Sequence, residues 1–337
     1  MNMKTRLITI ALLLLSTILC NLALAEETTG PVAIAIHAGA GTIKRENLSA
    51  EDEAKVRAKL EEAVRAGHEV LASGGSSLDA VTRAVTILED APFFNAGRGA
   101  VFNADGINEL DASIMDGQTL NAGAVAGVHN VRNPVLLARK VMTESVHVML
   151  IGEGAEAFAR EQGITFEDDA YFRTEYRWDQ LQKAKARETA QAPGTPDTWL
   201  STVGAVALDS NGDVAAATST GGMTNKRWGR VGDVPVIGAG TYADNASCAV
   251  SATGHGEYFI RATAARDICA RVQYTGVSLQ EAADQVVMQK LVDMGGGGGI
   301  IAVDPKGNIS LTFNTPGMYR ASVDTDGNTY VGIYKDE

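Results

Sequence analysis

The sequence predicts a layered α+β fold whose sheets are mainly antiparallel. Three observations support this prediction: short strand-like runs cluster together, helical segments also cluster, and the turns between neighbouring strands are short. The sequence shows no internal repeat, no Walker A motif and no strand followed by Gly-x-Gly-x-x-Gly. A Rossmann-type parallel sheet is therefore disfavoured.

The first half of the chain begins with a strand and two helices. Val32–Ile36 is a short apolar run that ends at a glycine-rich turn. Ser49 and Asp52 form a capping box, which predicts an amphipathic helix to about residue 72. Ser77 can cap a second helix, which ends near residue 90 because Pro92 follows. The next predicted elements are strands at 110–115, 122–128 and 146–151, with helices at 133–142 and 152–162.

The second half opens with a change of composition. Residues 165–200 are charged and aromatic and end in Ala-Pro-Gly-Thr-Pro-Asp, which predicts a helix followed by a linker over about 185–201. Short strands dominate from Thr202 onward. They are predicted at 203–208, 214–218, 246–251, 300–303, 309–313 and 330–333, with helices at 256–272 and 278–292.

The N-terminus has the pattern of a secretory signal peptide. Lys4 and Arg6 form a basic start, residues 7–25 carry no charge, and Ala23-Leu24-Ala25 is a small-x-small cleavage site. The alternative is an uncleaved membrane anchor, but the cleavage site and the polar residues in the run favour removal of residues 1–25. We therefore expect an exported protein, periplasmic or secreted, with no stable membrane insertion after cleavage.

Composition excludes several other classes. The chain has 337 residues, of which 45% are hydrophobic and 21% charged, so it can bury a large core. Its net charge of −12 and the lack of a basic stripe disfavour nucleic-acid binding. The five histidines lack zinc-ligand spacing, so no catalytic metal is predicted. Outside the signal peptide only Cys248 and Cys269 remain, and the sequence leaves their pairing open.

Threonines beside glycines are the most informative chemical pattern. They occur at Thr202-Val203-Gly204, at Thr218 to Gly222, and at Thr253-Gly254. A threonine hydroxyl becomes nucleophilic when a base lies beside it, and the α-amine of an N-terminal threonine is such a base. The linker leads directly into Thr202, so one cut would create that amine. Taken alone, each threonine is more simply a strand residue and each Thr-Gly pair a turn.

Eight segments, taken in order, resemble the plant-type (type 2) L-asparaginases, also called isoaspartyl peptidases, of the N-terminal nucleophile (Ntn) hydrolases. The segments are IAIHAGAG (34–41), LEDAPFFNAGRGAVFN (88–103), ELDASIMDG (109–117), TVGAVALD (202–209), ATSTGGMTNK (217–226), GRVGD (229–233), ATGHGE (252–257) and FNTPGMYRA (313–321). The resemblance covers the chain from about residue 32 onward. It implies a four-layer αββα sandwich with mainly antiparallel sheets.

The resemblance also implies a self-cleaving hydrolase of β-aspartyl bonds. The precursor would be cut between Ser201 and Thr202 into an α-chain, 26–201, and a β-chain, 202–337. Thr202 would be the nucleophile and its α-amine the base, giving an aspartyl ester from isoaspartyl dipeptides or L-asparagine. Alternatives are a glycosylasparaginase and a non-processed relative that only binds amino acids. A homodimer of processed αβ units is implied as well.

Further residue roles follow from the same resemblance. Thr220 would hydrogen-bond the nucleophile, and Asn95 would lie near it. The Thr253 hydroxyl and the Gly254 N–H would stabilise the oxyanion. The remaining implied substrate contacts are Arg230 for the α-carboxylate, Asp233 for the α-amine, and the backbone of Gly254 and Gly256.

The resemblance implies no cofactor for catalysis, but it does imply a structural sodium ion. Backbone carbonyl groups would hold this ion, and such oxygen ligands suit a hard cation. The implied ligands are Leu88, Glu89, Ala91, Phe94, Ala96 and Arg98. Two positions depart from the usual family pattern: Ser201 stands where Gly or Asp is usual, and Ala38 replaces a glycine of the first loop.

Overall fold

The computed structural model describes residues 30–190 and 202–337. The predicted signal peptide, Ser201 and residues 191–200 of the predicted linker lie outside the described residues. Within the described ranges, no helix combines the length and the apolar character needed to cross a membrane.

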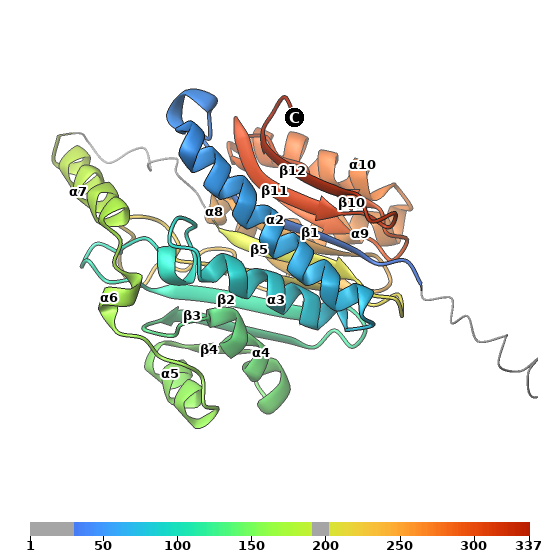
Figure 1. Cartoon of the computed structure of the whole chain (residues 1–337), viewed down its shortest axis with the longest axis horizontal. Helices are drawn as coiled ribbons and strands as arrows, with labels where there is room; N and C mark the ends of the chain where they lie inside the picture. Colours follow the sequence, from blue (N-terminus) through green and yellow to red (C-terminus); the bar gives the residue numbers. More distant parts are fainter. Residues whose placement is uncertain (1–29, 191–201) are drawn as a thin grey trace, which may run out of the picture. The chain divides into compact units, whose positions relative to one another are not determined.

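The larger sheet has eight strands, seven of them joined in antiparallel pairs (Figure 1). Its order is β12-β11-β1-β5-β6-β2-β3-β4, and only the β3–β4 pair is parallel among the pairs of this described sheet. The strands are β1 (Ala33–Gly41), β2 (Leu110–Asp116), β3 (Ala122–Val128), β4 (Met149–Ile151), β5 (Val203–Leu208), β6 (Val214–Thr220), β11 (Gly317–Val323) and β12 (Thr329–Tyr334).

The smaller sheet has four strands in the order β10-β9-β8-β7, all antiparallel. They are β7 (Thr241–Asp244), β8 (Cys248–Gly254), β9 (Gly298–Val303) and β10 (Ile309–Ser310). Strands that are buried on both faces read as continuous apolar runs, which explains why β5 and β9 show no alternation in the sequence.

Helices lie on the outer faces of the two sheets (Figure 1). The helices before the linker are η1 (Arg45–Asn47), α2 (Ala50–Ala72), α3 (Ser77–Glu89), η2 (Gly97–Gly99), α4 (Pro134–Glu144), α5 (Gly152–Glu161), α6 (Asp169–Phe172) and α7 (Glu175–Ala190). Those after it are α8 (Gly256–Ala262), α9 (Ala264–Thr275), α10 (Leu279–Asp284), the π-helix η3 (Gln285–Lys290) and α11 (Leu291–Met294).

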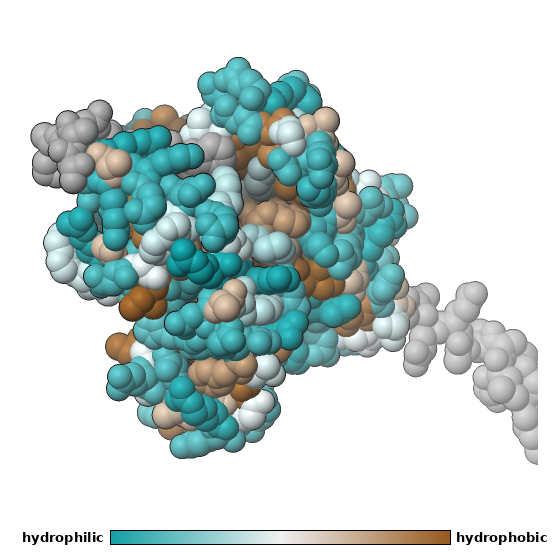
Figure 2. Space-filling view, turned by 60° about the vertical axis from the view of Figure 1, so that its left-hand side comes forward, coloured by the Kyte–Doolittle hydropathy of each residue, from teal (hydrophilic) through white to brown (hydrophobic). Residues whose placement is uncertain are grey.

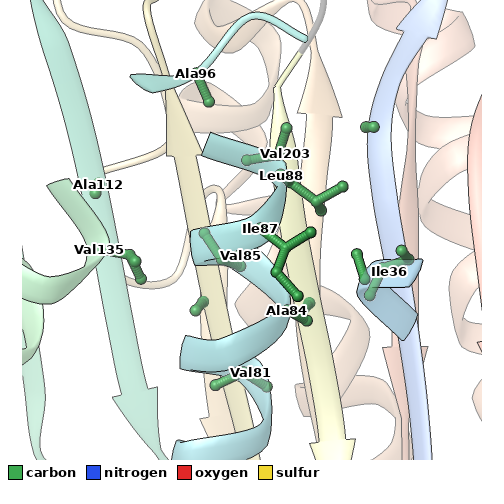
Figure 3. Packing of buried hydrophobic residues seen from close by; sticks show 14 of the residues in the cluster. Ile36, Val81, Ala84, Val85, Ile87, Leu88, Ala96, Ala112, Val135 and Val203 are labelled. Carbon is green, nitrogen blue, oxygen red and sulfur yellow. The ribbon is translucent and has the colours of Figure 1, made fainter. Parts of the chain in front are cut away.

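Three hydrophobic clusters hold the four layers together. In the first, α2, α3 and α4 pack on the larger sheet, and Figure 3 shows Val81, Val85 and Leu88 spaced along α3, with Leu88 beside Val203. In the second cluster, the helices from α8 through α11 pack on the smaller sheet. A third lies between the sheets and is rich in alanine and valine, which allows the sheets to approach closely. The αββα prediction is therefore confirmed.

The outer surface is mostly polar. Figure 2 shows one face that is largely hydrophilic, with separate hydrophobic areas. Two large apolar side chains that are nearly fully exposed are Val146 and Trp228. Scattered exposure of this kind is normal for a globular protein.

Several predicted boundaries need correction. The first strand continues through the glycine-rich segment, with a bulge between His37 and Ala40. Ser76, rather than Ser77, caps α3, because its side chain accepts a hydrogen bond from the Asp79 N–H. The predicted linker starts too early, since α7 continues to Ala190.

The predicted helices after residue 256 are interrupted. Helix 256–272 divides at Thr263, whose φ of +46° is left-handed and ends α8. Helix 278–292 contains the π-helical turn η3 between α10 and α11. The strand predicted at 146–151 shortens to Met149–Ile151, that at 246–251 shifts to Cys248–Gly254, and that at 309–313 shortens to Ile309–Ser310.

Cys248 and Cys269 form a disulfide that joins β8 to α9. The bond closes a loop of 21 residues. We expect the double variant Cys248→Ala/Cys269→Ala to lose about 3 kcal/mol of unfolding free energy, because the unfolded chain regains loop entropy. Urea denaturation would measure the loss. Wild-type protein treated with reductant should show the same shift, and equal midpoints for all three samples would contradict the prediction.

Candidate active site

Thr202 lies immediately before β5 and its hydroxyl contacts a second threonine. Its Oγ1 donates to Thr220 Oγ1 at the end of β6, over 3.2 Å. The pairing of Val203 with Ser219 places the two threonines on neighbouring strands. Thr220 Oγ1 also accepts from the Gly222 N–H at 3.0 Å. Both threonine side chains are buried, so their geometry is fixed by packing as well as by hydrogen bonds.

Asn95 fixes the turn that follows β6. Its Nδ2 donates to the Gly222 carbonyl at 2.7 Å, and its Oδ1 accepts from the Val101 N–H at 2.9 Å. Gly221 has no room for a side chain, because a Cβ there would lie 2.6 Å from Asn95 Oδ1. In this structure Asn95 therefore acts on the Gly221–Gly222 turn, next to the two threonines.

Thr253, Gly254 and Gly256 lie at the end of β8 and the start of α8. The Thr253 hydroxyl accepts from the Ala40 N–H at 3.3 Å, which ties it to the glycine-rich part of β1. Gly254 faces β9 so closely that a Cβ would lie 2.6 Å from the Gly297 carbonyl. Its φ of +156° also favours glycine.

Arg230 and Asp233 present opposite charges beside Gly256. A Cβ on Gly256 would lie 2.8 Å from Arg230 Nη2 and 2.9 Å from Asp233 Oδ1. Arg230 is held by a two-pronged contact with Glu257, at 2.9 and 3.1 Å. Burial raises the pKa of Asp233 to about 7. Its Oδ2 is buried and has no hydrogen-bond partner among the described residues. A carboxylate of this kind can receive a cationic ligand.

A narrow pocket brings together Thr202, Thr220, Arg230, Asp233 and Gly254, whereas Asn95, Thr253 and Gly256 are not among its lining residues. It is lined by Thr202, Thr220, Gly222, Arg230, Gly232, Asp233, Val234 and Gly254. A larger hollow of about 500 Å³ lies elsewhere, between Asp105, Glu188 and Trp228, and contains none of the threonines. A hydroxyl nucleophile beside one cation and one anion is suited to a zwitterionic amino-acid derivative. The narrow pocket is therefore the candidate active site.

Two neighbours of this pocket were not predicted. Glu257 orients Arg230 through a hydrogen bond. The sequence did not identify this role, even though Glu257 is adjacent to the predicted residue Gly256. Lys226 lies buried beneath Gly222, and its Nζ is 3.4 Å from Glu109 Oε2. A lysine in a sequence gives no sign of its burial, and only the fold shows that it lies under the active-site turn.

The residues implied for sodium lie at the end of α3 and in the loop that leads through η2. Among the described residues, no cluster of three or more His, Cys, Asp or Glu side chains could hold a metal. Two glycines of this loop pack against backbone carbonyl groups: a Cβ on Gly97 would lie 2.5 Å from the Glu89 carbonyl oxygen, and one on Gly99 would collide with the Phe94 carbonyl.

Two facing sheets between helical layers, with a buried threonine hydroxyl at the start of a central strand, define an Ntn hydrolase. The family model described as asparaginase matches residues 30–333. The chain belongs to the asparaginase family.

Three relatives show how far the similarity extends. The isoaspartyl peptidase of Escherichia coli (strain K12) is 53% identical over 313 residues, which cover 91% of this chain and 98% of the relative. The probable isoaspartyl peptidase/L-asparaginase 2 of Arabidopsis thaliana is 41% identical, covering 91% and 100%. The isoaspartyl peptidase/L-asparaginase of Bos taurus is 43% identical, covering 90% and 96%.

Proposed function

We propose that the chain cuts itself between Ser201 and Thr202 and then hydrolyses β-aspartyl bonds in isoaspartyl dipeptides and L-asparagine. The observation that carries the proposal is the Thr202 hydroxyl on Thr220, in one pocket with Arg230 and Asp233. The products of the cut are an α-chain, 26–201, and a β-chain, 202–337. The names of the relatives favour this activity over a glycosylasparaginase or a mere amino-acid binder.

In the proposed hydrolysis, Thr202, Thr253 and Gly254 each have a separate role. The freed α-amine of Thr202 takes the proton from its own hydroxyl, and Oγ1 attacks the side-chain carbonyl of the substrate. Thr253 Oγ1 and the Gly254 N–H stabilise the oxyanion. The carbon–nitrogen bond breaks, the leaving amine takes the proton, and an aspartyl ester remains on Thr202. Water then releases aspartate with the same amine as base.

The substrate is held by its zwitterionic end. Arg230 can bind the α-carboxylate with two parallel hydrogen bonds, and Asp233 can accept from the α-ammonium group. Gly256 lets both side chains approach, because any larger residue would overlap them.

Intact-mass analysis with N-terminal sequencing tests the processing. We expect two chains, one of which starts at Thr202, and release of aspartate from a β-aspartyl dipeptide. A stable uncut chain without activity would contradict the proposal and favour the non-processed binder.

Asp233 is expected to govern the pH dependence of KM. Burial raises the pKa of Asp233 to about 7, so the group loses its proton as pH rises through neutrality, and only the carboxylate attracts the substrate ammonium. KM should rise as pH falls through 7, approaching tenfold per unit in more acidic solution. The Thr202 amine, with an ordinary pKa of about 7.7–8.0, should instead affect kcat. Asp233→Asn should give a high KM that no longer changes with pH, whereas a flat wild-type KM would contradict the assignment.

We also propose export, with removal of residues 1–25. The basic start, the apolar run and the small-x-small site support it, and so does the Cys248–Cys269 disulfide, because such bonds persist in oxidising compartments. Sequencing of protein from the natural source should show an N-terminus at Glu26.

The loop from Leu88 to Arg98 is proposed to hold a sodium ion through its carbonyl groups. The family resemblance supports this, as does the preference of hard cations for carbonyl oxygen ligands. An ion bound only by the folded state raises stability. We therefore expect a higher Tm in sodium chloride than in choline chloride at equal ionic strength. Identical Tm values would contradict the site.

Assembly into a homodimer of processed αβ units is proposed from the family resemblance. Sedimentation equilibrium at micromolar concentration would decide between one and two αβ units.

A further inference from the structure

A hydrogen-bonded chain of five buried polar side chains crosses the space between the two sheets behind Thr202. Its members are His37, Ser113, Thr218, Thr241 and Ser251, and all five are fully buried. The reaction described above uses none of them. Burying a polar group lowers stability unless the group is hydrogen-bonded. A hydrogen-bonded chain of buried polar side chains at this place therefore needs a structural or functional explanation.

Strand register brings three of the five into one row of the larger sheet. His37 of β1 pairs with Gly204 of β5, Gly204 pairs with Thr218 of β6, and Thr218 pairs with Ser113 of β2. Residues paired in this way point to the same face of a sheet. This face is the one that meets the smaller sheet.

The other two members come from that smaller sheet. Thr241 of β7 and Ser251 of β8 are directly paired. Gly204 has no side chain, and this allows the two sheets to approach each other here. A Cβ at this position would collide with Ser251 Oγ and lie 2.5 Å from His37 Nε2. A glycine in the strand that carries the nucleophile thus lets Ser251 reach His37.

The two hydrogen bonds of the His37 ring determine its protonation state and its tautomer. Its Nδ1 lies 2.9 Å from the Thr202 carbonyl oxygen, which can only accept, so Nδ1 carries a hydrogen. Burial lowers the pKa of His37 to about 3, and the ring is therefore neutral near pH 7. Its Nε2 must then accept, and the Ser251 hydroxyl donates to it over 2.8 Å.

The remaining links run in the same direction. Since the Ser251 hydrogen is used, Thr218 donates to Ser251 at 2.7 Å, and Thr241 donates to Thr218 at 2.5 Å. Ser113 has one hydroxyl hydrogen, which it shares as a three-centre bond between Thr241 Oγ1 at 2.8 Å and the Val234 carbonyl oxygen at 2.5 Å. Successive donors therefore point towards His37 and end at the Thr202 carbonyl. Aligned hydrogen bonds of this kind strengthen one another.

We propose that this chain positions the nucleophile, by holding the main chain of Thr202 at a fixed distance from the Asp233–Val234 turn. The proposal rests on the proposed function. Once the bond to Ser201 is broken, Thr202 is a chain end with no covalent restraint before it. Its carbonyl, held by His37, is then its nearest main-chain anchor, while Ser113 holds the Val234 carbonyl at the substrate side.

Kinetics of fully processed variants test the proposal. Ser251→Ala and Thr218→Val should lower kcat by about tenfold to a hundredfold, as expected for slight misplacement of a reacting group, with KM within twofold. Thr218→Ser restores the hydroxyl and should recover most of the loss. Ser310→Ala is the matched control, because the hydroxyl of this buried serine contacts the Thr312 hydroxyl and lies outside the chain.

A double-mutant cycle distinguishes one connected chain from separate contacts. Ser251→Ala and Ser113→Ala should be strongly non-additive in kcat/KM, whereas each should combine independently with Ser310→Ala. Multiplicative losses for the Ser251 and Ser113 pair would overturn the proposal, as would an active enzyme whose variants match Ser310→Ala. A wild-type protein that releases no aspartate would overturn the proposed function itself and the positioning role with it.

The state of His37 provides a readout independent of activity. ¹⁵N spectra of histidine-labelled protein should show a neutral His37 with its hydrogen on Nδ1 between pH 5 and 9. A hydrogen on Nε2 instead would contradict the direction of the whole chain.

Discussion

Replacement of Thr202 by alanine is expected to leave one uncut chain with no measurable hydrolysis of β-aspartyl dipeptides. In the proposed mechanism the same hydroxyl attacks the preceding peptide bond during processing and the substrate carbonyl during turnover. Loss of a nucleophile typically lowers kcat by about 10⁴-fold or more. Intact mass reports the first effect, and a coupled assay for released aspartate reports the second.

Two further variants serve as controls for Thr202→Ala. Thr202→Ser keeps a hydroxyl and should still be cut, but slowly. Thr312→Val removes a buried hydroxyl that does not line the pocket and should be processed like the wild type. Normal cutting of Thr202→Ala would show that another residue is the nucleophile.

Arg230→Ala should be cut normally and yet bind substrate poorly. Truncating one partner of a buried charge pair costs about 2–5 kcal/mol, which corresponds to a loss of about 30-fold to several thousand-fold in kcat/KM. Most of the loss should appear in KM, because the α-carboxylate is held equally in the ground state and the transition state. Steady-state kinetics with a β-aspartyl dipeptide would measure it.

Arg227→Ala is the matched control for Arg230. It removes the same charge three positions earlier, where the partner is the exposed Glu188. Its kinetics should remain within about twofold of the wild type. Arg230→Lys should recover only part of the affinity, because lysine keeps the charge and loses the planar fork. An unchanged KM for Arg230→Ala would contradict the carboxylate role.

Local signals in the sequence were sufficient for much of the fold. Ser49 and Asp52 set the start of α2 within a residue, and the apolar run of β5 was predicted with its observed bounds. Strand β11 was missed because it carries Arg320, whose guanidinium is buried and bonded to the Tyr330 hydroxyl. Strand β7 was missed because its four residues are too few to show a period.

The candidate site was predictable only in part. Thr202, Thr220, Arg230, Asp233 and Gly254 came from family resemblance, and the structure brings all five into one pocket. The His37 chain could not be predicted, because its members are spread over five strands and meet only through register. The helix break at Thr263 could not be predicted either, because the residue is neither glycine nor proline.

The strand order of the larger sheet has a consequence for the molecularity of folding. Strand β1 lies between β11 and β5, and β2 lies beside β6, so segments from before and after Thr202 are interleaved. The precursor therefore folds as a single chain in a first-order process. After the proposed cut between Ser201 and Thr202, an unfolded molecule could refold only by a second-order encounter of two fragments, at a rate that depends on concentration. Under the proposed processing, maturation is a one-way step, and the lifetime of the cut enzyme is set by its rate of unfolding rather than by an equilibrium.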